Sequence, residues 1–229
     1  MTISMTKREK TFGWIFLALT PLVLPLAVVY LCQLFRWPLD NGQMNVLLFG
    51  VNFALTVLIF WRFLWKNSRA AMDSPGKTFR WAGIGFGIYY GASTLVGMLI
   101  LLIAPDFANA NDASIREMAR EHYYLMMLGT VILVPIAEET LYRGLVFGSL
   151  RSKSRWLAYV VSTVAFSALH VVSYIGTLPP LHLLLSFLQY LPAGFALAFA
   201  YDKAGSIWAS ILVHMSVNQI AMISMLSMR

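Results

Sequence analysis

Long apolar stretches, separated by short polar segments, constrain this chain more than any other feature. Of its 229 residues, 59% are hydrophobic and 12% are charged, whereas soluble domains have about 45–50% apolar and about 25% charged residues. A run of about 20 apolar residues is long enough to cross a bilayer as a helix. Seven stretches reach this length: 13–35, 43–65, 81–104, 122–149, 156–176, 181–201 and 205–227. The sequence therefore predicts an all-α fold, a polytopic membrane bundle of about seven transmembrane helices.

The connections between these stretches are short, so consecutive helices are expected to run antiparallel in one membrane domain over residues 1–229. The two longer segments are 66–80 and 105–121, and the second is expected to hold a short interfacial helix after Asp112. The first apolar run is too long for the apolar region of a signal peptide, so we expect it to stay in the mature protein. The single cysteine, Cys32, excludes an intrachain disulfide framework and a cysteine-based metal site.

The net charge of +7 follows the predicted topology rather than indicating a nucleic-acid partner. Arg143 lies inside a predicted span, and all but four of the other lysines and arginines lie on one side of the bilayer. The four on the opposite side are Arg36, Arg116, Arg120 and Arg229. Because basic residues accumulate in cytoplasmic loops, this asymmetry predicts a plasma-membrane protein with its N-terminus in the cytoplasm and its C-terminus outside.

A few polar residues interrupt the apolar spans, and each needs an explanation. A charged side chain at the centre of a bilayer costs about 2.5–3.5 kcal/mol on insertion scales, so it requires a partner or a function. The residues concerned are Glu138, Glu139 and Arg143 in the fourth span, His170 in the fifth, His182 in the sixth, and His214 and Asn218 in the seventh.

Depth along the predicted helices indicates which of these side chains can meet. At about 1.5 Å per residue, Glu138, His170 and His214 fall in one layer of the bundle. His182 lies near the outer start of its span and misses that layer, so it is interpreted as structural or interfacial, as is His122 at the outer boundary.

Helical spacing separates the two adjacent glutamates. Glu139 and Arg143 are four residues apart, with the acid first, which favours an ion pair on one face. Glu138 points about 100° away around the helix and is left without that partner. His214 and Asn218 are also four residues apart and share a face. Pro135 removes one backbone donor and tends to kink the helix, which can open room for a substrate.

A carboxylate, two imidazoles and a carboxamide in a low-dielectric pocket can activate water for amide hydrolysis. Glu138 is the candidate general base. The histidines and Asn218 are candidates for holding the water and stabilising the oxyanion of the tetrahedral intermediate. The depth of Glu138 and His214 places the site nearer the predicted cytoplasmic end of their spans, so substrate access is expected from the cytoplasmic leaflet.

Three motifs in order on separate spans resemble the CPBP intramembrane proteases, a family that includes the type II CAAX prenyl endopeptidases and bacteriocin-immunity-type proteins. "EETLYRG" is similar to the EExxxR signature of that family, "FSALH" to its FxxxH and "HMSVN" to its HxxxN, and "AYDKAGSIWASILVH" resembles the usual approach to the last histidine. The resemblance covers about residues 120–220 as the catalytic core. Residues 1–119, the first three spans, carry no recognisable match.

The resemblance implies an endopeptidase in which Glu138 is the catalytic glutamate, His170 and His214 act with it on the water, and Asn218 contributes to the oxyanion site. Glu139 and Arg143 are implied to be supporting residues. Glu138, His170 and His214 could also hold zinc with an open fourth position. The same residues serve a metal-free mechanism, which we favour, so no cofactor is expected.

The expected substrate is a membrane-associated protein or a hydrophobic peptide met within the lipid bilayer, with no nucleic acid. A CAAX-type prenyl protease acting on lipidated C-termini is an alternative. A proton-coupled transporter is a rival hypothesis, because intramembrane Glu and His also form proton relays. The sequence lacks the internal repeats or broken helix pairs that are typical of transporters. A catalytically silent immunity or scaffold protein is the third hypothesis.

Overall fold

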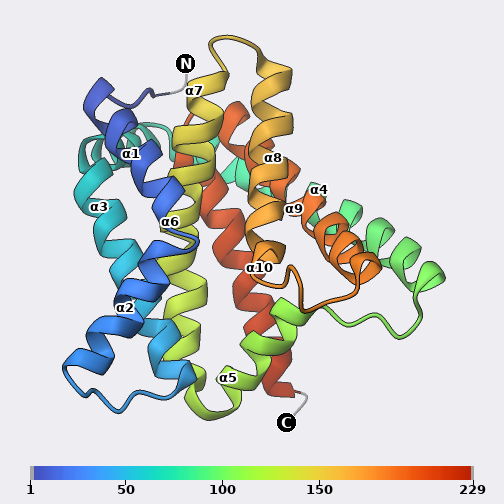
Figure 1. Ribbon diagram of the computed structural model, residues 1–229. Helices are drawn as coiled ribbons and strands as arrows, with labels where there is room; N and C mark the ends of the chain where they lie inside the picture. Colours follow the sequence, from blue (N-terminus) through green and yellow to red (C-terminus); the bar gives the residue numbers. More distant parts are fainter. Residues whose placement is uncertain (1–2, 228–229) are drawn as a thin grey trace.

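The computed structural model describes residues 3–227, which contain helices and no strand, so the predicted all-α fold is confirmed (Figure 1). The α-helices are α1 (Lys7–Leu19), α2 (Val23–Leu34), α3 (Asn41–Asp73), α4 (Pro75–Ile103), α5 (Ala110–Met127), α6 (Val134–Glu139), α7 (Gly148–Leu150), α8 (Arg155–Val172), α9 (Pro180–Ala204) and α10 (Ile207–Ser227). Two π-helical segments, η1 (Leu128–Leu133) and η2 (Thr140–Phe147), flank α6. Arg229, predicted to be on the outer side, lies outside the described residues.

Six helical stretches in the described chain are long and apolar enough to cross a membrane: α3, α4, the continuous stretch Ala110–Leu150, α8, α9 and α10. The number rises to seven if α1 and α2 together form one broken span. The chain is a multi-pass membrane protein, and the sequence prediction of about seven spans agrees with this range.

The first predicted span, 13–35, is not one straight helix. Helices α1 and α2 meet at an angle of 69°, and the break between them contains Pro21, with Pro25 in the first turn of α2. Proline lacks an N–H donor and its ring clashes with the carbonyl one turn earlier, so it disrupts a continuous helix. Average hydropathy detected the apolar run but not this break.

The fourth predicted span, 122–149, is the C-terminal part of a 41-residue helical stretch that starts at Ala110. The interfacial helix expected after Asp112 is therefore its first segment. Asn109 caps the start, since its side-chain oxygen accepts hydrogen bonds from the N–H groups of Asn111 and Asp112. A break in helical geometry at His122 separates this segment from the rest. The π-helical segments η1 and η2 lie on both sides of α6, the short helix that carries Glu138. Such segments are frequent at functional sites.

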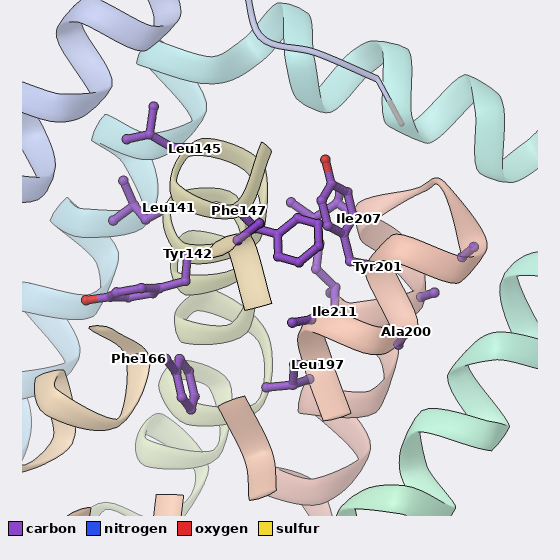
Figure 2. Packing of buried hydrophobic residues seen from close by; sticks show 14 of the residues in the cluster. Leu141, Tyr142, Leu145, Phe147, Phe166, Leu197, Ala200, Tyr201, Ile207 and Ile211 are labelled. Atoms are coloured by element: carbon purple, nitrogen blue, oxygen red, sulfur yellow. The ribbon is translucent and has the colours of Figure 1, made fainter. Parts of the chain in front are cut away.

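Buried side chains of η2, α8, α9 and α10 form the main hydrophobic core, part of which Figure 2 shows around Tyr142, Phe166 and Leu197. Gly194 lets α9 approach α8 closely, because a Cβ there would lie 2.9 Å from Thr163 Cγ2. Gly144 does the same for η2, where a Cβ would lie 2.8 Å from Phe63 Cε1. These approaches fix the positions of the helices that carry the candidate site.

Buried acidic side chains hold the helix ends and breaks in place. Asp202 at the end of α9 lies 2.6 Å from Arg151 Nε and 2.5 Å from Arg155 Nη2, and it accepts a hydrogen bond from Tyr159. In α3, helical geometry breaks at Phe60, and Glu9 of α1 accepts a hydrogen bond from the Phe63 N–H at 2.8 Å. The contact from Glu9 satisfies a backbone N–H group that lipid cannot.

Candidate active site

Glu138, His170, His214 and Asn218 line one cavity of about 590 Å³. They come from α6, α8 and α10, three helices that are separate in sequence. The structure thus brings together all four of the residues that the sequence analysis placed at the centre of the site. Tyr142 and Phe166 also line this cavity.

Glu138 presents a carboxylate with unused hydrogen-bonding capacity. Its side chain is 13% exposed, and Oε2 is buried without a hydrogen-bond partner among the described residues. A buried polar atom without a partner calls for an explanation, and a catalytic role or a bound water are among the explanations. The His214 imidazole lies close by, with Nε2 4.0 Å from Oε2.

His214 connects the two glutamates. Its Nδ1 lies 2.9 Å from Glu139 Oε1. A carboxylate can only accept a hydrogen bond, so Nδ1 carries the proton, and in the neutral imidazole Nε2 is an acceptor. Two acceptors, Nε2 and Glu138 Oε2, then face each other across 4.0 Å. A molecule that donates two hydrogen bonds, such as water, suits this position.

Glu139 differs from its neighbour because its charge is fully compensated. Its side chain and that of Arg143 are both completely buried, with Arg143 Nε 3.2 Å from Glu139 Oε2. The Ser210 hydroxyl donates to the same oxygen. Arg143 also donates to the Gly194 carbonyl at 3.0 Å and lies 4.3 Å over the Phe166 ring. This cluster holds α6, η2, α9 and α10 together and fixes His214 through Glu139.

His170 and Asn218 are each oriented by a backbone carbonyl. His170 Nδ1 lies 3.0 Å from the Phe166 carbonyl one turn earlier, and the carbonyl is an acceptor, so Nδ1 again carries the proton. Asn218 Nδ2 donates to the Thr130 carbonyl in η1 at 2.7 Å. That bond leaves the second N–H of the amide for another acceptor.

The two remaining histidines do not line the cavity. His182 stacks on Phe107 with ring centroids 5.9 Å apart. His122 Nε2 lies 2.7 Å from Asp40 Oδ2, which joins the break in α5 to the start of α3. Both positions suit the structural or interfacial roles expected from sequence.

The residues that the sequence left open as zinc ligands do not gather as a ligand set. Glu138 and His214 approach within 4.0 Å, but no group of three His, Cys, Asp or Glu in the part of the chain that the structure describes lies close enough to hold a metal ion. The arrangement of Glu138, His170 and His214 therefore does not fit a structural or catalytic zinc site, and we derive no step through a metal.

Sequence reasoning missed Ser210, although a signal was present. Ser210, His214 and Asn218 follow one another at intervals of four residues and share one face of α10. Sequence reasoning also missed the contributions of the N-terminal helices. The cavity is lined by Pro21 at the α1–α2 break, by Asn52 of α3 and by Ser93 of α4.

The shape of the cavity bears on the expected direction of substrate access. The cavity is lined by the last turn of α8, the C-terminal part of α10 and the first turns of α5, including Asp112. It therefore extends from Glu138 toward the end of the bundle where α5 lies, opposite the α7 end (Figure 1). The predicted topology places that end outside, which differs from the access from the cytoplasmic leaflet expected from depth alone, and the orientation of the chain stays a prediction. Counting residues along spans located the side chains but not the empty space beside them.

Comparison with known proteins supports the class of protein that this geometry suggests. Residues 120–220 match the family described as type II CAAX prenyl endopeptidase Rce1-like. Residues 120–220 are therefore similar to this family, as the three motifs predicted.

Two bacterial relatives are similar over parts of the chain. A Bacillus subtilis (strain 168) protein, named "Putative membrane peptidase YdiL", is 29% identical over 156 residues, which are 67% of this chain and 59% of that protein. The Lactococcus lactis subsp. lactis (strain IL1403) protein "UPF0177 protein YxdF" is 34% identical over 87 residues, 38% of this chain and 42% of that protein. The chain thus matches less than two thirds of the length of either relative. No solved structure matches it significantly.

Proposed function

We propose that the protein is an intramembrane endopeptidase in which Glu138 activates water to hydrolyse a peptide bond of a membrane-associated protein or hydrophobic peptide. The single observation that carries this proposal is the buried Glu138 Oε2, which has no hydrogen-bond partner in the described chain and faces the cavity shared with two histidines. The match of residues 120–220 to an endopeptidase family supports the same reaction class.

Glu138 takes a proton from a water molecule held between its carboxylate and His214 Nε2, and the water oxygen attacks the substrate carbonyl. The hydrogen bond from His214 Nδ1 to the buried Glu139 carboxylate keeps the imidazole in the tautomer with an accepting Nε2. Protonated Glu138 then returns the proton to the departing amine. In this scheme Glu139 never exchanges a proton, since its charge is held by Arg143 and Ser210.

Asn218 and His170 complete the site. The free N–H of the Asn218 amide donates to the oxyanion that forms on the substrate carbonyl. The bond to the Thr130 carbonyl fixes the amide before the substrate arrives, so little reorganisation is needed during the reaction. His170, with its proton on Nδ1, presents Nε2 as an acceptor that orients the attacking water or the departing amine.

The cavity limits the substrate to a short segment. Its volume of about 590 Å³ lies within the roughly 300–1,000 Å³ of small-ligand sites, which suits a few residues of an extended chain rather than a folded domain. A second candidate is cleavage near a prenylated C-terminus, which the description of the matched family favours. Under both candidates the substrate reaches Glu138 from the end of the bundle where α5 begins.

Membrane proteomes test the proposal in cells. We expect cells that express the wild type to contain peptide fragments that are absent from cells expressing Glu138→Gln, because the amide keeps the side-chain volume and removes the base. Glu121→Gln is the matched control, since this exposed glutamate of α5 does not line the cavity. Identical fragments in all three strains would contradict peptidase activity. Cleavage of a farnesylated CAAX peptide by the purified protein, with no other glutamate-dependent fragment, would favour the second candidate.

A further inference from the structure

The structure contains a polar cluster beside the candidate active site that the proposed reaction does not use. Tyr190 of α9 stacks on the His170 imidazole, with ring centroids 4.2 Å apart and planes inclined by 28°. The Phe166 ring also lies close to His170, at 4.7 Å. His170 therefore contacts one ring from its own helix and one from a neighbouring helix, both lining the same cavity.

The hydroxyl of Tyr190 is anchored to the first turn of α5. It donates a hydrogen bond to Asp112 Oδ1 at 3.1 Å and accepts one from Asn111 Nδ2 at 3.1 Å. Asn109, the cap of α5, donates to the neighbouring Gln189 at 2.8 Å. Two adjacent residues of α9 are thus bound to three residues at the start of α5, and the ring of Tyr190 is held at its far end.

We infer that Tyr190, anchored by Asp112, is a positioning residue for His170. The hydrogen bond between His170 Nδ1 and the Phe166 carbonyl restrains one edge of the imidazole, and the stacked ring restrains rotation of its plane. Together they fix the direction of Nε2, the nitrogen that remains available in the cavity. This inference rests on the proposed function for its effect on the reaction, whereas the restraint itself is independent of any activity.

The position of the hydroxyl separates this role from direct contact with substrate. The anchored oxygen is already bonded to Asn111 and Asp112, so the ring face is the part of Tyr190 that acts, through His170. A purely structural role, in which the cluster only joins α5 to α9, predicts changes in stability without changes at His170. The two roles therefore give different results in the following experiment.

The variants are Tyr190→Leu, which removes the ring, and Tyr190→Phe and Asp112→Asn, which keep the ring and weaken its anchor. Tyr174→Phe is the matched control, because the Tyr174 hydroxyl also contacts α5, at Ser114 Oγ 3.3 Å away, but it does not line the cavity. We expect Tyr190→Leu to lower kcat by up to about 100-fold, the loss that a misplaced reacting group can cause, with KM nearly unchanged. Tyr190→Phe and Asp112→Asn should lose a few-fold, and Tyr174→Phe should match the wild type.

Histidine NMR on the purified protein supplies a readout that needs no substrate. With His170→Gln used for assignment, the His170 ring signals should carry the ring-current shift of a stacked neighbour, keep it in Tyr190→Phe and lose it in Tyr190→Leu. Unchanged kcat and unchanged His170 signals in Tyr190→Leu would overturn the inference. If the leucine variant does not fold, wild-type kcat in both Tyr190→Phe and Asp112→Asn would overturn it. If the wild type cleaves no peptide, the proposed function fails while the NMR measurement still decides the positioning role.

Discussion

Glu138 and Glu139 are neighbours in sequence, yet they lie in opposite surroundings. Glu139 is completely buried and contacts Arg143, Ser210 and His214. Glu138 lines the cavity and keeps one oxygen without a hydrogen-bond partner in the described chain. Between one residue and the next, a helix turns by about 100°, which is enough to move a carboxylate from a compensated ion cluster to the wall of a cavity.

This difference shows how one helix can combine stability with chemistry. In the proposed mechanism the compensated carboxylate of Glu139 holds His214 in one tautomer, and the uncompensated carboxylate of Glu138 binds and deprotonates water. His214 lies between the two glutamates, with Nδ1 2.9 Å from Glu139 Oε1 and Nε2 4.0 Å from Glu138 Oε2. The predictions that follow test whether the two faces can be separated experimentally.

The largest expected effect on stability is that of Arg143→Ala. Removing one member of a buried ion pair leaves the other charge uncompensated, at a cost of about 3–5 kcal/mol. We expect a corresponding loss of thermal stability in detergent, together with loss of activity. The double variant Arg143→Ala/Glu139→Gln removes the stranded charge and should recover part of the stability. An Arg143→Ala protein of wild-type stability that is inactive would place Arg143 in the chemistry instead.

Ser210→Ala should have an intermediate effect, since it removes a hydroxyl that donates to the buried Glu139 carboxylate. A hydrogen bond to a charged group contributes about 1.5–3 kcal/mol. Ser167→Ala is the matched control, because Ser167 is also fully buried while its hydroxyl has no partner among the described residues. We expect thermal unfolding to show a clear loss for Ser210→Ala and little change for Ser167→Ala. Equal losses would mean that the hydroxyl does not support Glu139.

The smallest expected effect is at the exposed pair formed by Asp40 and His122. A hydrogen bond from the Gln43 backbone N–H lowers the pKa of Asp40 from its ordinary value of 3.8. Its stabilising contribution is therefore present above that value and is lost as pH falls through the lowered pKa. Because exposed ion pairs contribute little, Asp40→Asn should unfold at nearly the wild-type temperature at neutral pH. A loss as large as that of Arg143→Ala would contradict the contrast between buried and exposed pairs.

The sequence alone predicted the features that depend on apolar length and on the helical repeat. Apolar length predicted the spans, and four-residue spacing predicted the Glu139–Arg143 pair. The break between α1 and α2 was missed because hydropathy averages over Pro21. The Tyr190–His170 stack joins helices that the sequence does not align, so no local pattern could predict it. The same limit applies to the direction of the cavity, which depends on side chains from several helices at once.

The most direct test of Glu138 as the base is peptide hydrolysis by the purified Glu138→Gln protein. The Glu139→Gln protein is prepared in parallel, and thermal unfolding is recorded for both. Glu138→Gln should be inactive and unfold within about 2 °C of the wild type, which corresponds to a change of less than about 1 kcal/mol for a chain of this size. Glu139→Gln should unfold at a clearly lower temperature, because it breaks the buried cluster around Arg143. Undiminished hydrolysis by Glu138→Gln would contradict the assignment of Glu138 as the base.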